Sequence, residues 1–305
     1  MNWKKMAAAL AAVLLVLVSA GGVAFWLRPA HVALQLGYLQ EPMKGFHSAT
    51  VTVEGRPMHY LATGPEHGPV VVLVHGLGGS AEDWLHLAPY LAHAGYRVYM
   101  PDLFGYGRSP RPADFSYSVR DESAAVIGFL DAMQLQQVDL GGWSMGGWIA
   151  QLAAVAFPER IHRLLLFDSV GLYAPPQWNT DLFTPADEDQ LRQLQLLLEP
   201  APRHIPSLIA RDILRISHER AWVIHRALDS MLTGRDTTDA LLPTLRMPVL
   251  LVWGDLDRIT PLSLGNRMHE LIPGSELVVA PGCGHMAPRD CTAIVGPRVV
   301  EFLGR

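Results

Sequence analysis

Short apolar runs alternate with longer amphipathic stretches along most of this chain. Residues 69–76, "PVVVLVHG", form a continuous run rich in β-branched residues, which is typical of a strand buried on both faces. Residues 80–95, "SAEDWLHLAPYLAHAG", follow with the apolar spacing of a helix. The same succession continues, with strands expected at 96–102, 137–143, 161–169, 247–254 and 275–282 and helices expected at 118–133 and 145–157. This alternation predicts an α/β protein whose mostly parallel central sheet carries helices on both faces.

Two stretches depart from the alternation. Residues 49–64 hold two short segments of alternating polarity, which predict a β-hairpin. The other stretch lies between the strands expected at 161–169 and 247–254, where the strand pattern disappears and the apolar spacing is helical. We therefore expect an α/β core over residues 48–171 and 245–305, with a helical cap, or lid, inserted over residues 172–244.

The amino-terminal segment is a candidate membrane anchor. Residues 6–27 contain no charged residue, and at ~1.5 Å per residue a helix of this length would span about 33 Å, close to the ~30 Å of a bilayer core. Two lysines precede the segment and only Arg28 follows it closely. The positive-inside bias then predicts a single-pass protein with its main domain on the extracytoplasmic, periplasmic side. We expect residues 1–27 to form the anchor and residues 28–47 a linker.

A cleaved signal peptide is the competing interpretation of this segment. Val18-Ser19-Ala20 resembles a small-residue cleavage site, and cleavage there would yield a secreted protein. The apolar run nevertheless continues through "VAFWL", beyond the ~7–15 residues of a typical signal core. We therefore favour a retained anchor and a membrane as its partner.

Composition excludes several classes of function. The 305 residues are half apolar and carry a net charge of −5, and no run rich in lysine or arginine occurs, so a nucleic-acid partner is not expected. The two cysteines, Cys283 and Cys291, lack the paired spacing of a zinc site. Neither a metal nor a cofactor is expected. The cysteines could form a disulfide, but two buried thiols are the preferred expectation, because the sequence does not give their Cα separation. The oligomeric state is not determined by these patterns.

A glycine-rich turn supplies a candidate nucleophile. Residues 142–146, "GWSMG", fit G-x-S-x-G between an expected strand and an expected helix, where a sharp turn would lift the Ser144 hydroxyl above the sheet. The backbone N–H of Met145, at the start of that helix, and that of Leu77, in the loop "HGLGG", are candidate oxyanion-hole donors. His75 is expected to brace this second loop.

A serine hydroxyl needs an adjacent base, and a histidine base needs an acid that orients it. His285 lies directly after the last expected strand, downstream of the serine. Asp257 lies just past the end of the strand at 247–254 and is the preferred acid. Asp168, at the end of the strand at 161–169, is the alternative.

These segments, in this order, resemble those of the α/β-hydrolase fold family. The resemblance is carried by "HGLGGS", "DLFGYGRS", "GWSMGG", "WGDLD" and "GCGH", and it extends from about residue 48 to the end. With one amino-terminal apolar segment and a helical cap, the layout is similar to that of membrane-anchored monoacylglycerol lipases and related bacterial serine esterases. The resemblance implies a serine hydrolase with the triad Ser144, Asp257 and His285. The sequence "MAPRDCTAIV" after the histidine departs from the usual Glu-Arg-Pro-like continuation.

The expected substrate is a neutral and fairly apolar carboxylic ester, or a lipid. The expected cap is rich in leucine, and Trp178, Leu182 and Phe183 could line an acyl pocket or simply pack the cap against the core. No cluster of Arg or Lys occurs there that would bind a carboxylate or phosphate.

Two other activities stay open. The "SMGG" turn also occurs in relatives of this fold that hydrolyse carbon-carbon bonds of ring-fission (meta-cleavage) products. More remotely, residues 76–81 fit G-x-G-x-x-A after a strand and Asp102 ends the next one, which is the pattern of a dinucleotide-dependent oxidoreductase.

Overall fold

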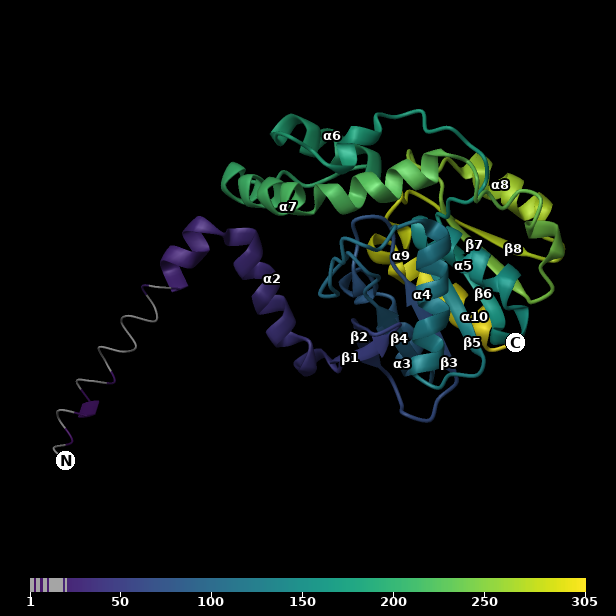
Figure 1. The fold of residues 1–305 in the computed structure, drawn as a ribbon, viewed down its shortest axis with the longest axis horizontal. Coiled ribbons are helices and arrows are strands. Elements are labelled where there is room, and N and C mark those ends of the chain that lie inside the picture. Colours follow the sequence, from purple (N-terminus) through teal and green to yellow (C-terminus); the bar gives the residue numbers. More distant parts are fainter. Residues whose placement is uncertain (1–2, 4–5, 8–9, 11–18, 20) are drawn as a thin grey trace.

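A computed structural model describes residues 3, 6–7, 10, 19 and 21–305 of the chain. Its centre is an eight-stranded sheet in the order β1-β2-β4-β3-β5-β6-β7-β8 (Figure 1). The strands are β1 (His47–Val53), β2 (Arg56–Thr63), β3 (Val70–Val74), β4 (Arg97–Pro101), β5 (Val138–Trp143), β6 (Ile161–Phe167), β7 (Val249–Gly254) and β8 (Glu276–Ala280). Strands β1, β2 and β4 pair antiparallel, and the pairs from β4 through β8 are parallel. The predicted hairpin and the predicted mostly parallel sheet are both confirmed.

Helices cover both faces of the sheet, as the continuous apolar strands require. One face packs against α4 (Val119–Ala132), α5 (Met145–Ala156) and α8 (Leu262–Leu271), and the other against α3 (Ala88–His93), α9 (Ala287–Asp290) and α10 (Thr292–Leu303). Because side chains alternate along a strand, Leu164 and Leu166 of β6 belong to the first core, whereas Leu165 and Phe167 belong to the second. Both cores are therefore formed by the same strands.

One predicted helix is broken in the structure. The stretch 80–95 forms a short 3₁₀ helix, η2 (Ala81–Trp84), and then the separate α3. Pro89 lies in the first turn of α3, where its missing N–H costs nothing. A continuous helix would place Pro89 in the interior, where its ring clashes with the preceding turn. The other 3₁₀ helices are η1 (Pro42–Lys44), η3 (Pro158–Arg160), η4 (Thr180–Phe183) and η5 (Leu242–Thr244).

The chain between β6 and β7 contains two long helices. They are α6 (Glu188–Leu198) and α7 (Ser207–Leu232), and they lie together outside the two helical layers (Figure 1). Helix α7 is the longer of the two, with 26 residues. Its Val223 and Ile224 are buried, and Ile224 Cδ1 lies 3.7 Å from the position that a Cβ on Gly78 would take. Helix α7 therefore packs over the loop that follows β3.

The residues before β1 are attached to α7 rather than forming a free linker. Residues 28–47 contain α2 (Pro29–Gln40) and η1. The guanidinium of Arg28 forms an ion pair of 2.6 Å with Asp212 of α7, whose other oxygen accepts the backbone N–H of His31 at 2.9 Å. This carboxylate is buried and sits at the amino-terminal end of α2, where a negative charge is favourable.

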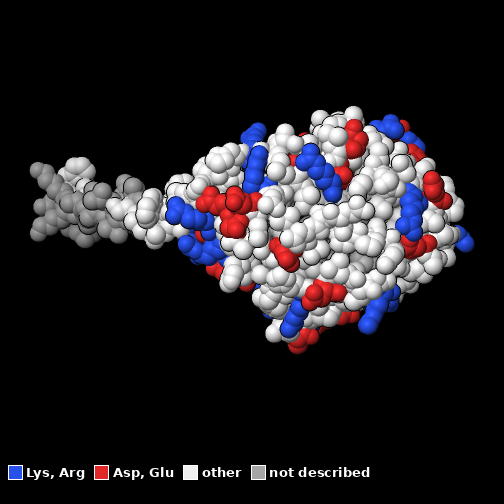
Figure 2. Space-filling model, turned by 90° about the horizontal axis from the view of Figure 1, so that it is seen from above, with Lys and Arg blue, Asp and Glu red and all other residues white. Residues whose placement is uncertain are grey.

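Half of the expected anchor over residues 6–27 lies outside the described residues, namely residues 8–9, 11–18 and 20. In the part of the chain that the structure describes, no helix is both long and apolar enough to cross a membrane. On the face shown in Figure 2, positive and negative side chains are interspersed among neutral ones.

Candidate active site

The Ser144 turn has the geometry that its sequence predicted. Ser144 follows β5 directly, precedes α5 and has φ 56° and ψ −118°, a strained conformation for a residue other than glycine. A Cβ on Gly142 would lie 2.1 Å from the carbonyl oxygen of Gly146, and one on Gly146 would lie 2.2 Å from that of Val74. Both flanking positions must therefore be glycine for β5, α5 and β3 to approach this closely.

The two candidate oxyanion donors follow the neighbouring parallel strands β3 and β5. Met145 is the first residue of α5, and Leu77 lies in the loop after β3. His75 braces that loop: its Nε2 accepts the backbone N–H of Leu103 at 3.1 Å, so its Nδ1 carries the hydrogen and donates to the Gly76 carbonyl at 2.8 Å. The loop is thus tied to the chain beyond β4, as expected for His75.

The structure brings Asp257 and His285 together. The His285 Nδ1 donates to Asp257 Oδ2 over 2.8 Å, and both side chains are almost completely buried. The same Oδ2 accepts the Thr260 hydroxyl at 2.6 Å, while Oδ1 accepts the backbone N–H groups of Ile259 and Thr260 at 2.8 and 2.9 Å. These donors hold the carboxylate in one orientation, in which it also accepts the hydrogen bond from the imidazole. Thr260 was not predicted as a site residue, although its position three residues after an aspartate is typical of such a turn.

Trp143 joins the serine turn to the histidine loop. Its indole N–H donates to the His285 carbonyl oxygen at 2.7 Å, and the two rings lie 5.6 Å apart, centroid to centroid. The hydroxyl of Ser144 forms no hydrogen bond to the imidazole among the described residues. Catalytic hydrogen bonds are often long without substrate and tighten in the complex. The backbone N–H of Leu256 donates to the backbone carbonyl oxygen of Cys283 at 2.9 Å. This bond connects the loop that carries Asp257 to the loop that carries His285.

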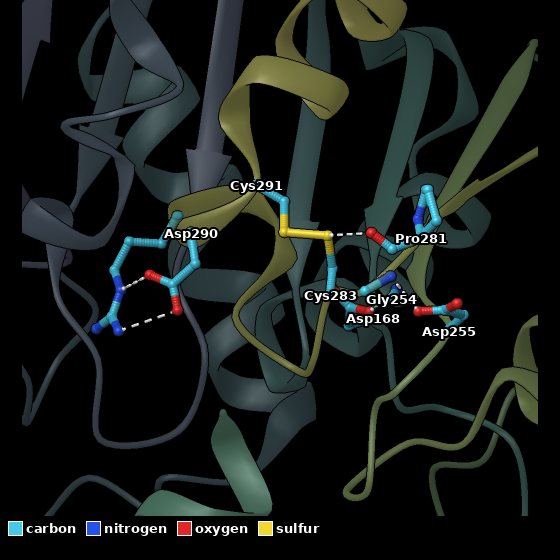
Figure 3. The surroundings of a disulfide bond; sticks show 9 residues. Asp168, Gly254, Asp255, Pro281, Cys283, Asp290 and Cys291 are labelled. Atoms are coloured by element: carbon cyan, nitrogen blue, oxygen red, sulfur yellow. Dashed lines mark hydrogen bonds and ion pairs between the residues drawn. A yellow bond between two sulfur atoms is a disulfide. The ribbon is translucent and has the colours of Figure 1, made fainter. Parts of the chain in front are cut away.

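A disulfide closes the His285 loop. The expectation of two free thiols was wrong: Cys283 and Cys291 are bonded, with their Cα atoms 6.3 Å apart (Figure 3). Eight positions separate the two residues, and α9 turns the chain back between them. His285 lies inside the closed loop. Sequence separation alone could not show this approach, because it depends on how the loop folds back.

Asp168, the alternative acid, forms its hydrogen bonds with other groups. It follows β6 directly and is completely buried, and its Oδ1 accepts the Gly254 N–H at 2.7 Å. Burial, and then the charge of Asp257, raises the pKa of the Asp168 carboxyl well above its usual range. The imidazole Nδ1 is instead paired with Asp257.

Asp102, the acid of the dinucleotide interpretation, is also committed to protein partners. Its carboxylate accepts the backbone N–H groups of Ala81 and Arg108 at 2.7 and 2.8 Å and the His59 Nδ1 at 2.7 Å. Burial alone would raise the pKa of Asp102, but the hydrogen bond from His59 and its other partners hold that pKa below its ordinary value. This fully buried carboxylate braces the loops after β3 and β4 and is not available to a ribose. In the part of the chain that the structure describes, no group of His, Cys, Asp or Glu could hold a metal ion.

An apolar cavity of about 300 Å³ lies between α5, α7 and the loop before α8, and Asp257 and His285 are not among its lining residues. Thr260, which contacts Asp257, forms part of its wall, as does Trp178. Phe183 packs on Trp178 with ring centroids 5.3 Å apart, and Leu182 is buried nearby in η4. Among the described residues that line the cavity, none is charged. The lining residues are Trp148, Ser169, Val170, Leu172, Tyr173, Ala174, Pro175, Pro176, Trp178, Thr180, Leu228, Met231, Leu232, Gly234, Thr237, Ile259, Thr260 and Leu264.

Comparison with known proteins places these features in a wider group. The family described as "Alpha/beta hydrolase family" matches residues 71–295. A 2-hydroxy-6-oxononadienedioate/2-hydroxy-6-oxononatrienedioate hydrolase from Paraburkholderia phymatum is 29% identical over 270 residues, covering 81% of this chain and 91% of the relative.

Two solved structures are similar over most of the chain. The structure of a membrane phospholipase A, described as a bacterial virulence factor, has a TM-score of 0.83 and 26% identity, with 97% of each chain covered. That of a putative lipase from Acinetobacter baumannii has a TM-score of 0.80 and 26% identity, covering 88% of this chain and 95% of the other.

Proposed function

The chain belongs to the alpha/beta hydrolase family, and we propose that it is a serine hydrolase that cleaves carboxylic esters of fairly apolar acyl groups. An esterase of the monoacylglycerol lipase kind is the activity that fits best. The observation that carries this proposal is the buried Asp257–His285 hydrogen bond of 2.8 Å beside the strained turn of Ser144. A nucleophile, a base and an acid that orients the base are the groups that acyl transfer through serine needs.

The proposed reaction proceeds through an acyl-enzyme. The Ser144 oxygen attacks the ester carbonyl carbon while His285 Nε2 takes the hydroxyl proton, and Asp257 stabilises the imidazolium through Nδ1. The carbonyl oxygen becomes an oxyanion held by the N–H groups of Leu77 and Met145. The carbon–oxygen bond to the alcohol then breaks, and the departing alkoxide receives the proton from His285. Water repeats these steps on the acyl-enzyme and releases the acid.

We assign the acyl group to the apolar cavity beside Thr260. Its uncharged lining favours a hydrocarbon chain, since each buried methylene contributes about 0.8 kcal/mol. Helix α7 supplies Leu228 and Met231 to one wall and Trp148 of α5 lies in another. We infer that residues 172–244 act as a lid whose inner side is the acyl site.

Carbon–carbon bond hydrolysis is the second candidate. It is favoured by the 29% identity to the 2-hydroxy-6-oxononadienedioate/2-hydroxy-6-oxononatrienedioate hydrolase. A dioate carries two carboxylates, and a buried carboxylate needs a charged or strongly hydrogen-bonding partner. The described residues that line the cavity include no Arg or Lys. This lining favours an uncharged ester over a dioate as the substrate.

We further propose that residues 6–27 anchor the protein in a membrane with the α/β domain on the periplasmic side. The described residues just before α2 support this, because Val23, Phe25, Trp26 and Leu27 each expose half or more of their surface. The disulfide also fits an oxidising compartment. Signal cleavage and secretion is the alternative. Intact-mass measurement of the protein from washed membranes separates them: retention predicts the full chain, and cleavage predicts a chain that starts after about residue 20.

A substrate panel tests the proposed activity. The full chain in detergent is given nitrophenyl esters of increasing acyl length, monoacylglycerols and a dienone ring-fission product. We expect ester turnover that disappears in Ser144→Ala and persists in Ser116→Ala, a control at an exposed serine before α4. Faster turnover of the dienone than of every ester would overturn the ester assignment in favour of carbon–carbon hydrolysis.

A further inference from the structure

Asp168 is a buried carboxyl group that the proposed reaction leaves without a role. It follows β6 with φ 42°, a strained conformation for a residue other than glycine. Its N–H donates to the carbonyl oxygen of Val252 at 2.9 Å, and its own carbonyl oxygen lies 3.1 Å from Thr260 Oγ1, so its main chain is held at this point. The side chain is completely buried. The fold thus places this carboxyl at one point despite backbone strain.

The two oxygens of this carboxyl have different surroundings. Oδ1 accepts the Gly254 N–H at 2.7 Å (Figure 3). Oδ2 is buried and has no donor among the described residues. Burying an ionised carboxylate oxygen without a hydrogen-bond donor costs far more free energy than burying the protonated form. The reason is that the charge leaves water and gains no compensating partner. Oδ2 is therefore the atom on which a proton would reside.

Asp257 is the group that this proton would reach. The two residues meet at one hydroxyl group, because Thr260 Oγ1 lies 2.6 Å from Asp257 Oδ2 and 3.1 Å from the carbonyl oxygen of Asp168. The negative charge of Asp257 also raises the pKa of the Asp168 carboxyl. Asp257 already accepts from His285, Thr260 and two backbone N–H groups, and every one of these partners requires it to be an acceptor. Two ionised carboxylates only repel each other, whereas a neutral carboxyl can donate its O–H to an ionised one. The arrangement therefore fits one shared proton, held by Asp168.

We propose that Asp168 is a positioning residue: a neutral carboxylic acid that donates its Oδ2–H to the Asp257 carboxylate and so helps to hold Asp257 toward His285. Its effect on turnover rests on the proposed function, while its protonation does not. Because the donor is neutral, the Asp168–Asp257 pair carries a single negative charge beside the imidazole. A second negative charge there would repel the Asp257 carboxylate instead of holding it in place.

The electrostatics of the site agree with a proton on Asp168. Burial is the larger cause that raises the pKa of this carboxyl, and the negative charge of Asp257 is the next, against a smaller opposite effect of the Gly254 N–H. Among the described residues, two ionisable groups face Asp168 or its neighbour. Asp257 comes from the loop after β7, and His285, from the loop after β8, donates a hydrogen bond to Asp257. With the folded-state pKa above that of the unfolded chain, folding retains a proton that the unfolded chain loses. Stability from this group is therefore lost as pH rises above ~4, by up to tenfold in the folding equilibrium per pH unit, until the folded pKa is reached.

The substitution Asp168→Asn tests the proposal, because asparagine reproduces the neutral form. Its amide oxygen can accept from Gly254, its NH₂ can donate to Asp257, and asparagine tolerates a positive φ. Infrared spectra of the full chain in detergent at neutral pH are the first measurement. The wild type minus Asp168→Asn difference should contain one protonated-carboxyl band. Glu122→Gln is the matched control: Glu122 is a second buried carboxyl with a strongly raised pKa, on α4 and not in contact with Asp257, so its band should disappear separately.

Kinetics and stability complete the test. We expect Asp168→Leu, which cannot donate to Asp257, to lower kcat on the best ester about tenfold with little change in KM, and Asp168→Asn to recover most of that loss. Asp168→Asn should also lose the one-proton fall in stability between mildly acidic and alkaline pH. A difference spectrum without a protonated-carboxyl band, or equal kcat values for Asp168→Leu and the wild type with an intact fold, would overturn the proposal. If the wild type hydrolysed no ester, the proposed function would fail while the infrared result still decided the protonation.

Discussion

The indole N–H of Trp143 donates to the backbone carbonyl of His285 over 2.7 Å, so the residue before the candidate nucleophile holds the main chain of the candidate base. The two residues are 142 positions apart in the sequence. Trp143 ends β5 and His285 follows β8, at the carboxyl ends of both strands. A single side chain thus links the two loops on which the proposed proton transfer depends.

Trp143→Phe should lower kcat more than it changes KM. The ring keeps its packing, but the His285 carbonyl loses a buried donor, which costs on the order of 1–3 kcal/mol. A loss of about 1.4 kcal/mol in positioning corresponds to a tenfold lower rate. Steady-state kinetics on one nitrophenyl ester measure this, with Trp222→Phe on the exposed side of α7 as the control. Equal kinetics for the two variants would contradict the role given to the Trp143 hydrogen bond.

Asp257→Asn should be far more damaging than Thr260→Val. The amide cannot stabilise the imidazolium and favours the wrong imidazole tautomer, and the same change in serine proteases lowers kcat about 10⁴-fold. Thr260→Val removes one of several donors to the carboxylate, so a loss of about tenfold is expected. Turnover numbers at neutral pH check the ranking. A near-normal Asp257→Asn would place the orienting acid elsewhere.

Met231→Trp should shorten the acyl site. Met231 lies in the cavity wall on α7, and the larger ring would occupy space that we assign to the distal end of the acyl chain. We expect kcat/KM for long-chain nitrophenyl esters to fall by roughly tenfold or more, since ~1.4 kcal/mol corresponds to two buried methylenes. Acetyl ester turnover by the same variant is the internal control. A parallel fall for all chain lengths would argue against this placement of the acyl chain.

Thiol titration of the unfolded, unreduced protein should find no free thiol, because Cys283 and Cys291 are bonded. Replacing both by serine should lower stability by roughly 2–3 kcal/mol, the chain-entropy contribution of a loop this short. It should also lower kcat, since His285 lies within the closed loop. Urea unfolding and steady-state kinetics measure the two effects. Two titratable thiols in the untreated protein would exclude the bridge.

Asp212→Asn should loosen α2 from α7 without affecting catalysis. The buried carboxylate holds both Arg28 and the backbone N–H of His31, so its neutralisation removes a charge-assisted contact worth about 1.5–3 kcal/mol. Hydrogen exchange of the α2 amides should accelerate by tenfold or more. Glu219→Gln is the matched control, because Glu219 reaches the same arginine only at 3.8 Å and is exposed. Unchanged exchange in Asp212→Asn would show that other contacts hold α2.

Local patterns in the sequence predicted much of the fold. Continuous β-branched strands followed by helical stretches require a sheet covered on both faces, and the glycines around Ser144 are required wherever a strand, a turn and a helix approach this closely. These are short-range steric demands, so they are legible in neighbouring residues. The break before α3 was equally local, but the expected helix at 80–95 overlooked the proline at its centre.

By itself, the sequence determined the alternating α/β core, the strained serine turn, and the placement of candidate acids and a base on loops at one edge of the sheet. Only the tertiary structure decided that Asp257 pairs with His285 while Asp168 accepts from Gly254, that Cys283 meets Cys291, and that α7 closes an apolar cavity beside Thr260. The physical reason is range. Hydrogen bonds and disulfides form only within a few ångströms, and those separations depend on how elements distant in the chain pack together.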